Sequence, residues 1–263
     1  MEILNKEQDG SYKIHGENME MLTIFLDGAK GRRLIAEAGK MIYYDGNINI
    51  TAKVFDEKCS YRKQIFHTME KIIVEEPVTL THFAGSGEVG FADFVPGVIV
   101  PVHLEDEAIV VSKSSFIAAL DEIDISIVSQ KCVGNLFFGG EGLVLKRLHG
   151  KGDVFLHGGG NILTHYLEKD ETINAEAGAV VGWSETVTHK IEHAQHIKSA
   201  LFGGEGMFLS RFSGPGTVFI QTLPLNRLRG LMGSSICIAP PPMMFMEVVA
   251  LRLKRLIQRV IPF

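Results

Sequence analysis

The chain has 263 residues, of which 46% are hydrophobic, so it can bury a substantial core. Its formal net charge of −5 argues against general nucleic-acid binding, because that function needs a basic surface to replace the counterions of the phosphates. The three cysteines, Cys59, Cys132 and Cys237, are odd in number and far apart. They predict neither a disulfide framework nor a zinc ribbon, and a reducing, cytoplasmic compartment is expected.

The N-terminal residues MEILNKEQDGSYK have neither the basic start nor the apolar run of a signal peptide. No stretch approaches twenty uninterrupted apolar residues, so no membrane-spanning helix is expected. The sequence is therefore expected to fold as a globular body.

The first elements of a repeated pattern lie in the N-terminal third of the chain. Residues 34–39 (LIAEAG) resemble residues 172–178 (TINAEAG). Residues 80–91 (LTHFAGSGEVGF) match residues 145–156 at a shift of 65 positions. Residues 85–90 also spell G-x-G-x-x-G, but a strand-like segment rather than a helix follows, so a hairpin turn is preferred to a dinucleotide site.

The complete pattern occurs twice, in residues 137–157 and 201–221, which align without a gap. Each copy contains F-G-G-E-G followed by G-x-G, and we interpret it as a glycine-rich loop, a strand, a tight turn and a second strand. The loop and turn residues are Gly139, Gly140, Glu141, Gly142, Gly150 and Gly152 in the first copy, and Gly203, Gly204, Glu205, Gly206, Gly214 and Gly216 in the second.

Short apolar runs rich in β-branched residues alternate with turn signals along most of the chain, which is typical of strands. The sequence therefore predicts an all-β fold of three repeated units, each of which would be marginally stable alone, so the three are expected to pack together. The expected division is a first β unit with an N-terminal extension (1–95), a second (96–158), a third (159–225), and a linker with a C-terminal helix (226–263).

The glutamates of the two G-G-E-G loops, Glu141 and Glu205, allow two interpretations. The favoured one is structural: the glycines supply positive φ angles and the carboxylate accepts hydrogen bonds from loop amides. The other is that these loops contact a ligand, an anion or a neighbouring subunit.

Three histidines, His189, His193 and His196, would share one face of a helix at positions i, i+4 and i+7. With Glu192 nearby they are candidate ligands for zinc or a similar ion. The flanking sequence is typical of strand and loop, so a structural role is favoured and no metal or cofactor is predicted.

The segment after the third unit differs in composition. Residues 243–260 are expected to form an amphipathic helix, in which Val249, Leu253, Leu256 and Val260 share one face. The helix is basic on an acidic protein, so it could dock on the β units, on a neighbouring subunit, or peripherally on an anionic membrane.

The paired F-G-G-E-G and G-x-G blocks, with LIAEAGKMIYY at residues 34–44, resemble the mitochondrial-biogenesis family named for altered inheritance of mitochondria. The resemblance covers about residues 20–225 and points to a bacterial-type member. It implies repeated β-sandwich units like the tryptophan RNA-binding attenuation protein (TRAP-like, related to a double-stranded β-helix), often in a homo-oligomer. It supplies no catalytic residues.

Neither the residues nor the resemblance provides a convergent acid, base and nucleophile. The sequence therefore predicts a non-enzymatic oligomeric scaffold or assembly factor, with a homotrimer as the first guess for the assembly and no nucleic-acid partner. The alternative is a small-ligand or metal-binding protein that uses the three histidines or the G-G-E-G loops.

Overall fold

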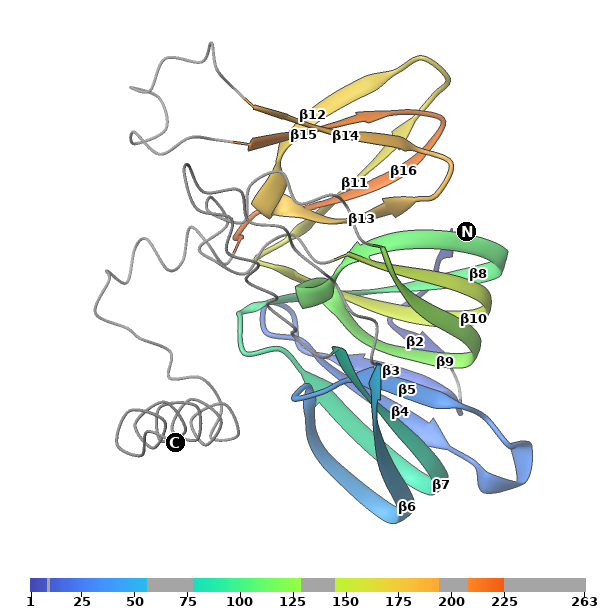
Figure 1. Ribbon diagram of the computed structural model, residues 1–263. Coiled ribbons are helices and arrows are strands. Elements are labelled where there is room, and N and C mark those ends of the chain that lie inside the picture. The colour runs from blue at the N-terminus through green and yellow to red at the C-terminus, as the bar shows by residue number, and fades with distance from the viewer. Residues whose placement is uncertain (9, 56–77, 129–144, 194–207, 225–263) are drawn as a thin grey trace, which may run out of the picture. The chain divides into compact units, whose positions relative to one another are not determined.

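The computed structural model describes residues 1–8, 10–55, 78–128, 145–193 and 208–224. The chain divides into two compact units, Met1–Asn226 and Arg227–Phe263, and all described residues belong to the first. They form sixteen strands and three short 3-10 helices (Figure 1), so the predicted all-β class is confirmed. The predicted C-terminal helix, 243–260, lies outside the described residues.

The strands of the N-terminal part are β1 (Glu2–Ile3), β2 (Glu7–Gln8), β3 (Tyr12–His15), β4 (Met21–Leu26), β5 (Leu34–Glu37), β6 (Met41–Phe55) and β7 (Val78–Ala92). Those of the middle part are β8 (Gly97–Ser112), β9 (Phe116–Val128) and β10 (Leu145–Gly159). Those of the last part are β11 (Ile162–Leu167), β12 (Thr172–Glu176), β13 (Val180–Ser184), β14 (Thr188–His193), β15 (Phe208–Ser213) and β16 (Gly216–Gln221). The 3-10 helices are η1 (Gly28–Lys30), η2 (Lys113–Ser115) and η3 (Ala177–Ala179).

Most of the strands belong to one antiparallel sheet. Its order is β11-β16-β13-β8-β10-β9-β5-β7-β4-β3-β2, with β1 beside β8 and β6 beside β7. A separate sheet has the order β12-β15-β14. Strands from distant parts of the sequence therefore meet, as when β5 pairs with β9 and β8 pairs with β13.

The first two G-x-G motifs do not form the tight turns expected from the sequence. β7 runs through Gly85 and Gly87, and β10 runs through Gly150 and Gly152, while both strands stay paired with their neighbours. All four glycines have positive φ angles, and the middle strands curve over together (Figure 1). A side chain on Gly150 would collide with the carbonyl oxygen of Glu122, so glycine permits a bend with close strand contact.

The third G-x-G motif has a different setting. A bend at Gly214 and Pro215 separates β15 from β16, and these two strands belong to different sheets. The same glycine pattern thus lies within a continuous bent strand in two places and between two strands in the third.

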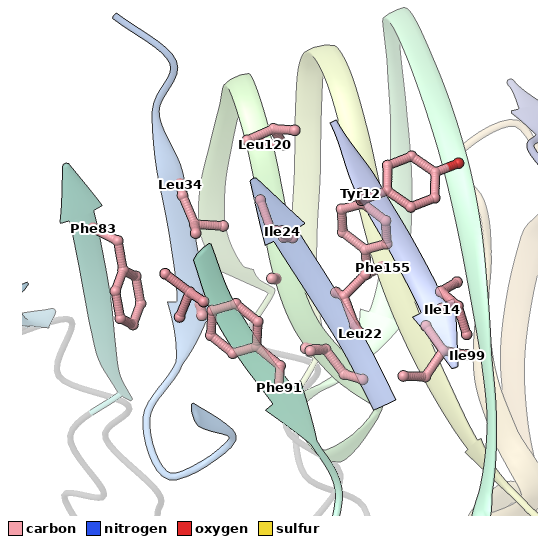
Figure 2. Packing of buried hydrophobic residues seen from close by; sticks show 14 of the residues in the cluster. Tyr12, Ile14, Leu22, Ile24, Leu34, Phe83, Phe91, Ile99, Leu120 and Phe155 are labelled. Carbon is pink, nitrogen blue, oxygen red and sulfur yellow. The ribbon is translucent and has the colours of Figure 1, made fainter. Parts of the chain in front are cut away.

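The core is built from side chains contributed by strands far apart in the sequence. In the first cluster, β3 and β4 pack on residues from β8, β9 and β10, and the ring of Tyr12 meets that of Phe155 edge-on at 4.8 Å. The labelled members in Figure 2 are Tyr12, Ile14, Leu22, Ile24, Leu34, Phe83, Phe91, Ile99, Leu120 and Phe155. A second cluster joins the middle strands to Val181 and Phe219, and a third surrounds Trp183. Neighbouring parts of the chain therefore bury one another.

Substituting Gly150 with valine should lower the free energy of unfolding by about 1–3 kcal/mol, because valine is strained at φ +137° and meets the backbone of β9. Urea denaturation measures the loss. The control is Gly31→Asn, since Gly31 has φ +62° with open space around it and asparagine tolerates this conformation. Equal losses for both variants would contradict the bend interpretation.

Candidate functional site

Five ionisable side chains gather where the N-terminal and middle parts of the chain meet. They are Glu37 at the end of β5, Lys40 in the turn before β6, Asp93 after β7, and Lys146 and His157 on β10. Apolar and polar residues alternate only imperfectly around Lys146, as expected for a strand that is covered on both faces. Leu145, Lys146 and Leu148 are all buried. We refer to these five residues as the ionic cluster.

The cluster consists of two buried ion pairs and a histidine. The Lys146 ammonium, 0% exposed, pairs with the Glu37 carboxylate and lies 4.9 Å from the centre of the Phe116 ring. The Lys40 ammonium pairs with Asp93 and donates a hydrogen bond of 3.1 Å to the carbonyl oxygen of Ser114. His157 Nδ1 lies 3.4 Å from the same Asp93 carboxylate.

Burial decides how these groups titrate. It lowers the pKa of Lys40 to about 8, against the attraction of Glu37, and it lowers the pKa of Lys146. Burial and the nearby Lys40 lower the pKa of His157 to about 4, against the raising effect of a hydrogen bond to the backbone of Val95. His157 is therefore neutral at pH 7, and the two cations balance the two anions.

A lysine whose pKa is lowered is a candidate nucleophile or base. Here each ammonium is held by a carboxylate, and both lysine side chains are buried. Because a reacting group must reach its substrate, this geometry favours a structural role: the ionic cluster ties β5 and the β5–β6 turn to β10.

A second set of charges lies at the bend of the middle strands. The guanidinium of Arg32 donates to both carboxylate oxygens of Asp121, at 2.9 and 2.7 Å, and Asp121 itself has a positive φ angle. His103 Nδ1 lies 2.7 Å from Asp153 Oδ1 and its Nε2 3.1 Å from Glu105. The hydrogen bond with Asp153 raises the pKa of His103. These contacts link the strands at the bend to one another and to Arg32.

The three histidines do not share a helical face. His189 and His193 lie on β14, where residues four apart are separated by about 13 Å, too far to bind one ion. His189 stacks on Phe212 at 4.8 Å between ring centroids and contacts Trp183 in a tilted arrangement at 4.4 Å, and burial lowers its pKa to about 4. His196 lies outside the described residues. The strand-like flanks that argued against a helical face in the sequence fit the structure, in which residues 188–193 form β14.

Both G-G-E-G loops, Gly139–Gly142 and Gly203–Gly206, also lie outside the described residues, so their roles remain predictions. Of the other glycines of the pattern, Gly150 and Gly152 lie within β10, whereas Gly214 lies in the bend between β15 and β16 and Gly216 is the first residue of β16.

Sequence reasoning missed the exposed edge of β6. In the part of the chain that the structure describes, β6 pairs with β7 alone. Its apolar side chains Met41, Ile42 and Tyr44 are 37%, 55% and 50% exposed. A long apolar edge strand is a template for another strand. The signal was present in residues 41–52 (MIYYDGNINITA), which contain neither lysine nor arginine nor proline.

Comparison with known proteins addresses the family and the fold. The sequence model of a family described as Mitochondrial biogenesis AIM24 matches residues 12–223. A search of the curated proteins found no match. A crystal structure of a protein from Streptococcus pyogenes is similar, with a TM-score of 0.63 and 20% identity over 84% of this chain and 97% of that chain. At this identity the likeness concerns the fold. Within the described segments, no helix is long and apolar enough to span a bilayer.

Replacing Glu37 with glutamine should lower the free energy of unfolding by about 3–5 kcal/mol, because it leaves the buried Lys146 without its counter-ion. The control is Glu185→Gln, which breaks the more exposed pair with Arg147 and should cost at most about 1 kcal/mol. Denaturant titration measures both. If the two losses are similar, the ionic cluster is not a buried tie.

The stability of the protein should fall between pH 6.5 and 4, in part because of His157. Its folded pKa of about 4 lies below its ordinary 6.5, so in this window the unfolded chain binds a proton that the folded chain does not. His157→Gln should lose less stability over the window than the wild type, while His15→Gln, at an exposed position, should behave as the wild type. Unfolding midpoints across this pH range test it, and parallel curves for wild type and His157→Gln would refute it.

Proposed function

The chain belongs to the Mitochondrial biogenesis AIM24 family, and we propose that it is a non-enzymatic β-repeat protein that acts as an oligomeric scaffold or assembly factor. In this proposal three TRAP-like units, 1–95, 96–158 and 159–225, form a rigid body that presents strands and loops to partners. Copies of the chain associate with one another, and a trimer is the assembly we expect.

Strand pairing supports the three-unit organisation. In each proposed unit the strand that contains G-x-G, or that begins at its second glycine, pairs with a strand that has one unpaired extra residue. The extra residue is Ile42 where β6 pairs with β7, Ile117 where β9 pairs with β10, and Val181 where β13 pairs with β16. In all three strands the bulge therefore falls on the second residue. A bulge that recurs at the same position is a regular feature of the fold and not a local irregularity.

The observation that carries the proposal is the contrast in burial at these matched positions. Residues 116–119 and 180–183 are buried, whereas Met41, Ile42 and Tyr44, at the matching positions of β6, are largely exposed. Exposed apolar side chains along an unpaired edge are typical of an association surface. The exposure of these β6 residues thus supports the proposal that the first unit contacts a partner through this edge. The matching edges of the second and third units are covered by other strands of the same chain.

The purified full-length protein should have a native mass that is a multiple of 29.0 kDa, with three copies as the simplest outcome. Native mass spectrometry of protein isolated gently from lysate measures it, and dilution through the micromolar range provides the control for non-specific association. A chain that is monomeric throughout would refute the scaffold proposal.

A further inference from the structure

We propose that the exposed edge of β6 binds β12 of a second copy of this chain, so that copies associate head to tail in one fixed register. The inference rests on the proposed oligomeric function and deepens it by naming the two strands that meet. It follows from how the chain already joins its own units.

Two contacts between units follow one rule. At each contact, the strand that precedes the three-residue turn of one unit pairs antiparallel with the strand that follows the turn of the next unit. The first contact is β5 with β9, and the second is β8 with β13. The pairs are Leu34 with Leu120, Ile35 with Ala119 and Ala36 with Ala118, and then Ile109 with Ser184, Val110 with Trp183 and Val111 with Gly182.

The two registers are also the same. Ala36 and Val111 are each the last residue but one of the strand before the turn, and Ala118 and Gly182 are each the third residue of the strand after it. Ala36 faces Ala118, and Val111 faces Gly182. The chain thus uses a single interface twice, with different side chains.

One strand of each type is left over at the two ends of this series. Across the described ranges, β6 pairs only with β7, and β12 pairs only with β15. β6 is the strand after the turn of the first unit, and β12 is the strand before the turn of the third. Applying the common register places Ala175 opposite Tyr43, Asn174 opposite Tyr44, and Ile173 opposite Asp45.

A second copy is the occupant that these observations favour. The open edge of β6 belongs to a strand that follows a turn, and the open edge of β12 belongs to a strand that precedes one. In the register used within the chain, β6 therefore cannot pair with a second β6, nor β12 with a second β12. The complementary strand is supplied by the same sequence, which makes the contact heterologous. Docking would bury Met41, Ile42 and Tyr44 as their matched residues in the other two units are buried. β6 also lacks the lysines and prolines that protect free edges over residues 41–52.

Cysteine cross-linking between two differently tagged full-length chains tests the register. One chain carries Tyr44→Cys and the other Asn174→Cys, with Cys59, Cys132 and Cys237 replaced by serine in both. Opposed residues of an antiparallel pair have Cα atoms about 4.5–5.5 Å apart, within disulfide reach. We expect a mixed disulfide dimer under mild oxidation. The control pair is Thr51→Cys with Asn174→Cys, because Thr51 lies on β6 about 23 Å from Tyr44 and should give no link.

The outcomes separate the inference from the proposed function. A Tyr44–Asn174 link without a Thr51–Asn174 link supports the inference. An oligomer in which Tyr44→Cys chains link only to one another, in which Thr51 links equally well, or in which Tyr44 and Asn174 do not link, overturns the inference and leaves the scaffold proposal standing. A wild-type monomer overturns both, and it is the result expected if another segment of the same chain covers β6.

A charge placed on the edge gives a second measurement. Ile42→Lys with Tyr44→Lys should shift the native mass to 29.0 kDa, because two ammonium groups would have to be buried in the contact. Both side chains are exposed in the single chain, so circular dichroism should stay unchanged. Thr51→Lys, at an exposed position of the same strand, should keep the oligomer. An unchanged mass for the double variant would overturn the inference.

Discussion

Antiparallel pairing between strands from different parts of the chain is the interaction on which the described structure depends. The β5–β9 and β8–β13 contacts each contain only three residue pairs. The residues in them are almost all buried, and a buried backbone amide or carbonyl that loses its partner costs free energy. A proposed unit of about 65 residues would be only marginally stable alone. It therefore depends on the strand that its neighbour supplies.

The ionic cluster makes one of these contacts chemically distinct from the other. Beside the β5–β9 contact, Glu37 of β5 pairs with Lys146 of β10. The matching positions at the β8–β13 contact are Ser112 and Ser210, which carry no charge. A buried ion pair adds little net stability over apolar residues, but it penalises any arrangement that separates the two charges. We therefore infer that the ionic cluster favours the pairing of β5 with β9 over a wrong pairing of β5 with β13. Next to β13 the Glu37 carboxylate would meet Ser210 in place of a lysine.

The sequence allowed the class of fold and the family to be predicted, because both depend on patterns that repeat over many residues. It did not allow the shape of the G-x-G motifs to be predicted. Gly150 and Gly152 have the composition of a hairpin turn, and only the continuous pairing of β10 with β8 and β9 shows a bend. The helical spacing of His189 and His193 was a weak indication for a similar reason, since these residues pair with β15 as part of a strand. The ionic cluster could not be predicted from the sequence, because Glu37 and Lys146 are 109 positions apart and meet only in the folded chain.

The covering of the other edges shows that the exposure of β6 is selective. The N-terminal segment places β3 beside β4 and β1 beside β8, so short strands cover edges that would otherwise remain open. No described strand does this for β6, although it is fifteen residues long and partly apolar. If copies associate through the same contact that joins the units within a chain, each copy adds three units with the same rotation between neighbours. The rotation between adjacent units is set by the β5–β9 and β8–β13 contacts, and it determines how many units close a ring. Because each copy contributes three units, that number must be divisible by three, and one third of it is the number of copies.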